Sequence, residues 1–419
     1  MDTLKKSTRL IILLIAIETI LYFFANMQKV LVPGAIFNQL LQLFPGTAST
    51  QISQLGVAFI ISNATGNFFV GLLSDRFGGD RVIAVGGVIL AVGSICSALT
   101  ASYHLLLFFR VMTGVGAASI FLSLTHDISR IAGKSFPIVL GLILMIGFSG
   151  SIVGATPFIA AVEKFGYQTT MLTIGAAMLV CQAVFLAFFF RKHESFADKS
   201  VKFVPRTYIE AMTKSNVLHI SATSMNFSVF FTLQTIIGKK FLEDFCHMDV
   251  HHAGLIFTAS MLIASLNGFI TALVSKMLKN KKMPIMHYAA YGTMLCTFLI
   301  LLALATNIRS PYIYCGALII IASTGNIGPI SYARLQSTNP EEKFGTVSSV
   351  ANSAAYVFSS LFGLVIGLLM DIFAPEVVDG IKIYGKSSYM LVFGFFFACA
   401  LGSSFMVSCL DEDGLKNKK

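Results

Sequence analysis

The chain has 419 residues, of which 55% are hydrophobic and 12% are charged, and its mean hydropathy is +0.78. Soluble domains carry about a quarter charged residues, so this composition excludes a soluble globular fold. The net charge of +10 does not indicate a nucleic-acid partner, because the basic residues are scattered over several short loops.

Apolar windows of roughly 20 residues, the length that crosses a bilayer as a helix, recur along the chain. Helices are expected rather than barrel strands, because the windows are long and a helix satisfies its own backbone hydrogen bonds in lipid. The sequence therefore predicts an all-α membrane protein with twelve spans, at residues 10–30, 53–74, 82–101, 104–124, 137–158, 168–190, 217–237, 253–275, 285–306, 311–333, 345–370 and 388–409.

The distribution of Lys and Arg predicts the orientation, because positive residues are retained on the cytoplasmic side. With the N-terminus inside, 22 of the 30 basic residues fall on the inner side and 7 on the outer side. We therefore expect both termini in the cytoplasm, and a plasma membrane or bacterial inner membrane as the location.

The first span carries a polar stripe made of Glu18, Tyr22, Asn26 and Lys29, which fall within about 80° of arc at 100° per residue. A carboxylate in a span is costly and normally faces a polar interior with a partner. We expect this stripe to face a central cavity, with Glu18 as the leading candidate for a functional residue.

Between the second and third spans lies a short charged turn with the sequence Gly71-Leu-Leu-Ser-Asp75-Arg76-Phe-Gly78-Gly-Asp80-Arg81. An Asp at the end of one helix can face the positive N-terminal end of another. The turn is interpreted as an electrostatic latch in which Arg76, Asp80 and Arg81 form a small ion-pair network. The alternative is an ordinary turn with solvated charges.

In the fourth span, Arg110 is expected to pair with Glu18, since the two residues fall at similar depths when counted from opposite membrane faces. Three roles stay open for this pair. It can take up and release a proton during a cycle, Arg110 can bind an anionic substrate, or the pair can be a static link between helices.

The longest inner connection runs from Arg191 to Asn216 and divides the spans six and six. Residues 1–190 and 217–419 are therefore predicted to form two bundles, with 191–216 as a middle loop. The stretch from Thr271 to Lys282 matches the first charged turn in position and basic character, but places Ser275 where Asp75 stands. Such repeats are common in transporters.

Polar side chains recur in the second half, in the seventh, tenth and eleventh spans. They either bind a solute in a cavity or hold neighbouring helices together. Gly325, Gly328 and Pro329 interrupt the tenth span and are expected to let it bend. The candidate positions are Asn226, Gln234, Asn326, Asn352 and Tyr356.

An outer loop holds Cys246, His247, His251 and His252, a spacing that can bind a metal but equally fits a solvated helix edge. We predict neither a metal nor a cofactor. The sequence contains no Gly-x-x-x-x-Gly-Lys-Ser/Thr motif, which disfavours transport driven directly by ATP.

Two motifs together resemble those of the major facilitator superfamily, and the resemblance covers essentially the whole chain. They are Gly71-x-x-x-Asp75-Arg76-x-Gly78-x-x-Arg81 and Arg110-x-x-x-Gly114-x-Gly116. The resemblance implies two six-helix bundles around a central cavity, lined in part by the first and fourth helices. It also implies that Asp75 faces the start of the eleventh span, near Gly345 and Thr346.

The fifth span only loosely resembles the glycine-proline run of the drug-antiporter branch, because Ala155 stands where that run has Pro. We therefore predict a monomeric secondary active transporter, a symporter that moves a small organic solute with protons. The alternative is a proton-driven exporter of amphipathic compounds, which the 38 Phe residues favour. An enzyme or a receptor is disfavoured, since we find no catalytic group set and no signalling domain.

Overall fold

A computed structural model describes residues 2–32, 36, 39–40, 43–45, 47, 49–154, 156–190, 205–378, 381–412 and 414–415. The predicted fold class is confirmed, since helices dominate and twelve of them, within this described part, are long and apolar enough to cross a membrane. These spans are Leu10–Val30, Gln54–Phe77, Gly79–Leu99, Tyr103–Ile131, Gly133–Val153, Tyr167–Phe189, Lys214–Asp244, His252–Met277, Met283–Ala305, Pro311–Thr338, Glu341–Met370 and Lys386–Ser408.

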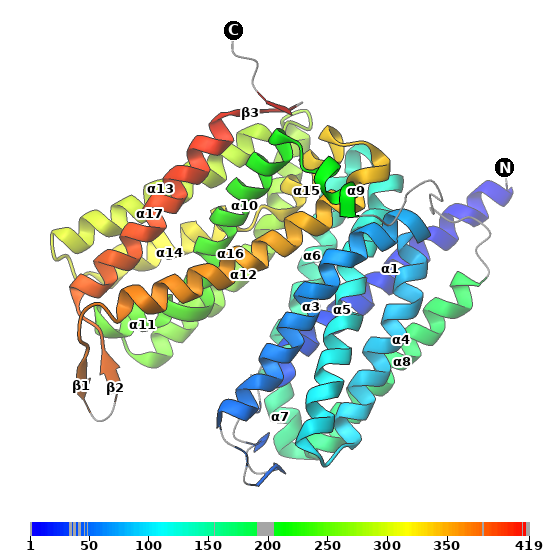
Figure 1. The fold of residues 1–419 in the computed structure, drawn as a ribbon, viewed down its shortest axis with the longest axis horizontal. Helices are drawn as coiled ribbons and strands as arrows, with labels where there is room; N and C mark the ends of the chain where they lie inside the picture. The colour runs from blue at the N-terminus through cyan, green and yellow to red at the C-terminus, as the bar shows by residue number, and fades with distance from the viewer. Residues whose placement is uncertain are drawn as a thin grey trace. The chain divides into compact units, whose positions relative to one another are not determined.

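The first compact unit contains residues Met1–Ala211 and Asn339–Ser353 (Figure 1). Within it α5 packs against α3 and α4, α1 against α6, and α4 against α8. Its elements are α1 (Asp2–Val30), α3 (Ser49–Phe77), α4 (Gly79–Leu99), α5 (Tyr103–Ile131), η2 (Gly133–Ser135), α6 (Phe136–Val153), α7 (Thr156–Phe165), α8 (Tyr167–Phe189), α9 (Pro205–Ala211), η4 (Glu341–Lys343) and the start of α16 (Phe344–Met370).

The second unit contains residues Met212–Thr338 and Ala354–Lys419. Here α13 packs against α14 and α17, and α17 also packs against α10. The elements are α10 (Lys214–Thr232), η3 (Leu233–Ile237), α11 (Gly238–Asp244), α12 (Val250–Met277), α13 (Met283–Ala305), α14 (Pro311–Gly325), α15 (Gly328–Thr338), the rest of α16, β1 (Glu376–Val378), β2 (Ile381–Ile383), α17 (Lys386–Ser408), β3 (Leu410–Asp411) and β4 (Gly414–Leu415).

Two antiparallel hairpins accompany the helices, one formed by β1 and β2 and the other by β3 and β4. In the first, Glu376 pairs with Ile383. The predicted middle loop falls partly outside the described residues, which lack 191–204. The division into domains at 191–216 therefore stays a prediction.

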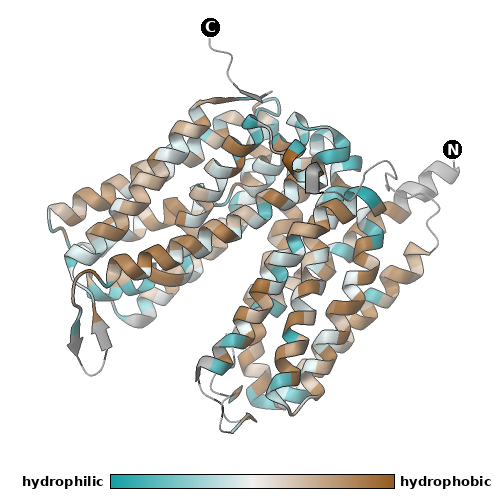
Figure 2. Ribbon diagram, viewed as in Figure 1, coloured by the Kyte–Doolittle hydropathy of each residue, from teal (hydrophilic) through white to brown (hydrophobic). Residues whose placement is uncertain are grey.

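Apolar residues predominate along the helices and hydrophilic residues gather near many helix ends (Figure 2). Large hydrophobic side chains such as Val57, Leu364 and Phe405 are exposed on the helices. In water such extensive exposure would be a liability, whereas lipid is the natural environment of an apolar helix surface. The chain is an integral, multi-pass membrane protein, and these side chains fit contact with the bilayer.

Glycines on α6 allow α1 to approach closely. A Cβ added at Gly147 would lie 2.1 Å from the ring of Tyr22, and one at Gly150 would lie 2.1 Å from the carbonyl oxygen of Phe23. Small residues at such crossings are the usual basis of helix packing in membranes. The glycine run of the fifth span is thus explained by packing, while Ala155 lies outside the described residues.

Replacing Gly150 by Ala tests this packing. We expect Gly150→Ala to lower the free energy of unfolding by about 1–3 kcal/mol, because the added methyl group overlaps the α1 backbone. Gly394→Ala on α17 is the matched control, since a Cβ there meets no atom within 4 Å. Thermal unfolding in detergent measures both, and equal midpoints for the two variants would contradict the packing role.

Candidate functional site

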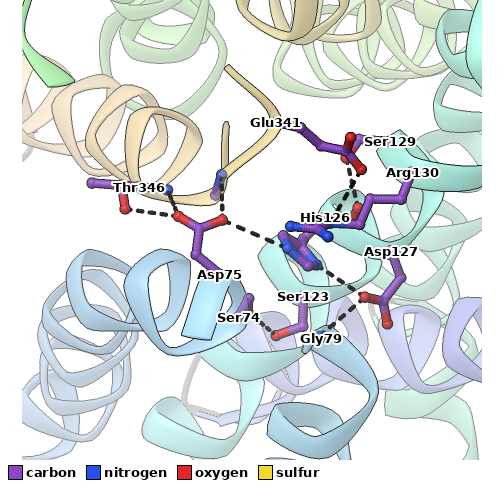
Figure 3. Close-up of polar contacts among 11 residues, drawn as sticks. Ser74, Asp75, Gly79, Ser123, His126, Asp127, Ser129, Arg130, Glu341 and Thr346 are labelled. Atoms are coloured by element: carbon purple, nitrogen blue, oxygen red, sulfur yellow. Dashed lines mark hydrogen bonds and ion pairs between the residues drawn. The ribbon is translucent and has the colours of Figure 1, made fainter. Parts of the chain in front are cut away.

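Asp75, near the end of α3, caps the N-terminus of α16 (Figure 3). Its Oδ1 accepts a hydrogen bond from the backbone N–H of Gly345 at 2.9 Å. Its Oδ2 accepts from the N–H of Thr346 at 2.7 Å and from the Thr346 hydroxyl at 2.8 Å. The first N–H groups of a helix lack intrahelical partners and carry partial positive charge. The buried carboxylate therefore satisfies two of them, at the residues that the resemblance indicates.

Two glycines make this close contact between α3 and α16 possible. A Cβ on Gly71 would lie 2.2 Å from the carbonyl oxygen of Gly345, and a Cβ on Gly345 would lie 2.3 Å from Oδ1 of Asp75. Gly78 joins α3 to α4 with φ of 85°, a left-handed conformation that favours glycine. Close packing therefore explains the glycines at 71 and 345, and the backbone conformation explains the glycine at 78.

A second carboxylate caps α4 beside the first cap. Oδ1 of Asp127, on α5, accepts a hydrogen bond from the N–H of Gly79 at 3.0 Å. His126 lies between the two capping residues, with Nδ1 at 3.0 Å from Oδ1 of Asp127 and Nε2 at 3.6 Å from Oδ1 of Asp75. We call Asp75, His126 and Asp127 the capping cluster (Figure 3).

The expected ion-pair network of Arg76, Asp80 and Arg81 is not formed among the described residues. Arg76 lies over the ring of Phe77, 5.4 Å from its centroid. Oδ1 of Asp80 accepts the backbone N–H of Arg81 at 2.9 Å, in the first turn of α4. Asp80 therefore stabilises the start of α4. Arg81 donates to Asp80 through its backbone N–H and not through its guanidinium group.

The expected pairing of Arg110 with Glu18 is wrong for this structure. The guanidinium of Arg110 donates to the carbonyl oxygens of Gln28 at 3.2 Å, Val32 at 2.7 Å and Leu55 at 3.4 Å. Gln28 lies ten residues after Glu18 on α1, about 15 Å along the axis. The last carbonyls of a helix lack intrahelical partners and carry partial negative charge, so they attract the cation to the end of α1.

Arg110 is 1% exposed and also lies over the ring of Phe59, 4.6 Å from its centroid. Because its donors are used by backbone carbonyls, the arrangement favours a structural role over substrate binding. Glu18 is 2% exposed on α1.

The remaining stripe on α1 is buried or half-buried in the first unit. Tyr22 stacks on Phe121 of α5, with ring centroids 5.2 Å apart. Asn26 donates to the carbonyl oxygen of Tyr22 at 3.0 Å, and Nζ of Lys29 donates to Oδ1 of Asn26 at 3.2 Å. That the stripe faces a substrate cavity stays a prediction.

The tenth span is interrupted where the sequence predicts it, since α14 ends at Gly325 and α15 begins at Gly328. Amide side chains of neighbouring helices bind the exposed carbonyls at the break. Asn226 donates to the carbonyl oxygen of Thr324 at 2.9 Å, and Asn267 donates to those of Ser323 and Asn326. Backbone that leaves the helical pattern inside a membrane needs such partners.

The other candidate amides also bind backbone. Asn326 donates to the carbonyl oxygen of Ala264 at 3.0 Å, and Gln234 donates to that of Phe257 at 2.7 Å. Asn352 and Tyr356 are half-buried on α16. For Asn226, Gln234 and Asn326 the geometry favours the packing alternative over solute binding.

A cavity of about 10 Å³ lies beside Asn226, Thr223 and Ile327. It has room for about one water molecule. An organic solute does not fit there.

A second buried arginine, which sequence reasoning missed, holds the segment after α17 to α15. Arg334 is fully buried and donates through Nε and Nη2 to the carbonyl oxygen of Asp411, at 3.1 and 2.7 Å. Its Nη1 lies 3.1 Å from Nδ1 of His219, whose Nε2 lies 2.8 Å from the Ser331 hydroxyl. Since Arg only donates, Nδ1 of His219 is the acceptor and the ring is neutral.

The histidine loop contacts other side chains rather than gathering into one group. His247 lies 3.1 Å from Arg309, and His252 lies 3.3 Å from Asp249. Burial raises the pKa of the Cys246 thiol to about 12, which disfavours a thiolate ligand at neutral pH. The side chain of His251 lies outside the described residues, and the described ones contain no group of three or more potential ligands.

The amino-acid sequence matches the model of a known protein family. The model of the Major Facilitator Superfamily matches residues 18–364. The chain is also 22% identical over 181 residues to an uncharacterized transporter of Buchnera aphidicola, and 31% identical over 108 residues to monocarboxylate transporter 11 of Mus musculus. These matches cover 42% and 26% of this chain, and 44% and 24% of the relatives, so the chain spans less than half the length of each.

Two solved structures share the fold at low sequence identity. The proton:xylose symporter XylE has a TM-score of 0.70 at 12% identity, with 94% of this chain and 95% of that one covered. A bacterial homologue of the iron transporter ferroportin has a TM-score of 0.76 at 11% identity, covering 95% and 98%.

Replacing Arg110 by Lys separates a structural from a binding role. We expect Arg110→Lys to lower the free energy of unfolding by about 2 kcal/mol or more, because an ammonium group cannot reproduce the planar set of donors to three carbonyls. Arg81→Lys, at an exposed position, is the control. Thermal unfolding gives the result, and an unchanged midpoint for Arg110→Lys would remove the structural role.

Replacing Asp75 by Asn tests the cap on α16. Asn lacks the charge and one acceptor oxygen, so amide hydrogen exchange of the peptide that contains Gly345 and Thr346 should rise about tenfold. Ser275→Ala is the control, because the Ser275 hydroxyl donates within its own turn, to the carbonyl oxygen of Lys281. Equal exchange of that peptide in both variants would contradict the cap.

Proposed function

Because the chain belongs to the Major Facilitator Superfamily, we propose that it is a secondary active transporter that moves a small organic solute across the membrane by alternating access. The twelve spans and their two compact units support this proposal. The superfamily is one of transporters rather than enzymes. The absence of a phosphate-binding motif in the sequence supports an ion or solute gradient as the energy source.

The observation that carries the proposal is the cap of Asp75 on α16. The first residues of α16, through Ser353, group with the first unit, and the helix from Ala354 onward groups with the second. A helix held at its start by a single carboxylate can be released when that carboxylate finds another partner. Such a two-state contact is what alternating access requires.

We assign the proton as coupling ion on the basis of Glu18. Its carboxyl group is buried within the span Leu10–Val30, and intramembrane carboxyl groups commonly serve in proton relays. Because Arg110 is held by carbonyls about 15 Å further along α1, it does not oppose protonation of Glu18 by direct pairing. The role of Glu18 is therefore separable from that of Arg110.

The solute is proposed to be organic, and monocarboxylates are among the compounds to test, since one partial relative is a monocarboxylate transporter. On the polar stripe of α1, Lys29 is the cation that can meet a carboxylate, at a half-buried position beside Asn26. Export of amphipathic compounds remains the alternative. A ligand screen that finds only lipophilic cations would favour it.

The orientation of the chain in the membrane and its oligomeric state are also part of the proposed function. The bias of Lys and Arg supports cytoplasmic termini and a plasma or inner membrane. We propose a monomer as the transporting species, since each chain supplies both units.

Replacing Glu18 by Gln tests the coupling. In liposomes loaded with a solute from the screen, Glu18→Gln should lose uptake driven by a pH gradient, by about tenfold or more, while keeping solute exchange without a gradient. Glu163→Gln, an exposed carboxylate on α7, is the matched control. Uptake of the Glu18 variant with full pH dependence would exclude Glu18 as the coupling residue.

A further inference from the structure

His126 lies between two carboxylates that each cap a helix (Figure 3). It is 1% exposed, and its two ring nitrogens face different residues. Nδ1, at 3.0 Å from Oδ1 of Asp127, carries the proton of the neutral ring, because a carboxylate only accepts. Nε2 then carries no proton, and its lone pair faces Oδ1 of Asp75, which lies 3.6 Å from Nε2.

In this position the neutral ring makes no hydrogen bond through Nε2, which is buried without a partner. A lone pair that faces a carboxylate oxygen is mildly repulsive. A proton bound at Nε2 converts this contact into a charge-assisted hydrogen bond to Asp75. The site is therefore built to accept one proton at a defined atom.

The N-terminus of α16 already supplies positive partners to the same carboxylate. Asp75 accepts three hydrogen bonds from Gly345 and Thr346, at 2.7–2.9 Å. When α16 withdraws, the carboxylate loses these donors and the positive helix end. Protonated His126, one contact away, can then replace them.

We propose that His126 is a proton-binding site that competes with the N-terminus of α16 for the Asp75 carboxylate, so that proton uptake favours the release of α16. Protonated His126 and the N-terminus of α16 are both positive and meet the same oxygen, Oδ1 of Asp75. Each therefore weakens the binding of the other, and this coupling is reciprocal. The released state is favoured at lower pH and the capped state at higher pH. The inference rests on the proposed function only where release is read as a step of transport.

Other charged groups near the cluster are already engaged. Arg130 of α5 pairs with Glu341 at 3.6 Å, and Glu341 is two-thirds exposed. Burial, with the charge of Asp75, raises the pKa of Tyr208 on α9 to about 12, so this hydroxyl does not titrate in the range of interest. The titratable and charged groups at the cluster are Asp75 of α3 and Asp127 of α5 beside the ring, Arg130 of α5 with Glu341 of η4, and Tyr208 of α9, which interacts with Asp75.

The pH dependence of the cap originates at one side chain of the cluster, His126. Asp127 keeps its hydrogen bond from Gly79 in either state, since it holds α4 and not α16. His126 is the member with a ring nitrogen, Nε2, that is buried without a hydrogen-bond partner.

Amide hydrogen exchange of the full-length protein in detergent micelles tests the proposal. Exchange of the peptide spanning residues 341–349 is followed from pH 8 to pH 5.5 and divided by that of the same peptide free in solution, which removes the intrinsic effect of pH. In the wild-type protein, protection should fall about fivefold or more as the pH is lowered. Constant protection would overturn the proposal.

Two variants test whether the pH-dependent protection originates at the imidazole ring of His126. His126→Asn retains a donor toward Asp127 but cannot bind the second proton, so its protection should not change with pH. His104→Asn, at an exposed histidine on the same helix, should behave like the wild type. A pH response of normal size in His126→Asn would overturn the assignment. If that variant does not fold, His126→Gln replaces it, with the same expectation.

The transport proposal fails separately. A chain that shows this exchange response but transports no compound retains the proton site and loses the transporter assignment. If the chain shows gradient-driven uptake but the protection of residues 341–349 stays constant with pH, the transporter assignment is retained and the proton site at His126 is lost.

Discussion

Helix ends buried inside a membrane protein lack water, and this constraint accounts for the capping contacts described above. The first N–H groups and last carbonyls of a helix have no partners within the helix. Where they are buried they cannot turn to solvent, so a side chain from another element must meet them. Asp75 does this for α16, and Arg110 does it for the end of α1.

The sign of each partner follows the helix dipole. Carboxylates meet helix starts, as Asp127 does at α4 and Glu412 at α13, where its Oε1 accepts from the N–H groups of Lys282 and Met283. Guanidinium and amide donors meet carbonyls at helix ends and breaks, as Arg110 does at α1 and Asn267 at the end of α14. Such contacts gain from the dipole as well as from the hydrogen bond.

The two halves solve the same problem with different residues. The third and ninth spans both begin at a capping carboxylate. The buried Asp127 comes from the following helix, α5, whereas the half-buried Glu412 comes from the segment that follows α17. In the repeated turn, Ser275 closes its own turn while Asp75 reaches another helix. A repeat detected in sequence therefore preserves the helix pattern more faithfully than the contacts.

The spans and the break at Gly325–Gly328 could be predicted from the sequence, because hydropathy and glycine positions are local properties. The partner of Arg110 could not be predicted. Counting residues along two helices gives the depth of each Cα atom, but it does not show in which direction a long side chain such as Arg extends. The sequence pattern does not single out His126 and Asp127, because the apolar window of the fourth span ends at residue 124, whereas α5 continues to Ile131. Beyond such a window charged residues are common and carry little information.

The need to satisfy buried helix ends also distinguishes charged side chains that are fixed in place from those that can change partner. Arg110 and Arg334 donate to carbonyls of elements within their own units, and any displacement would leave several buried donors and acceptors unsatisfied at once. Asp75 differs, because its partners on α16 can be replaced by a single neighbour, His126. An exchange of partners costs far less than a loss of partners. The residues best suited to a conformational change are therefore those with a second partner within reach, and depth in the membrane alone does not identify them.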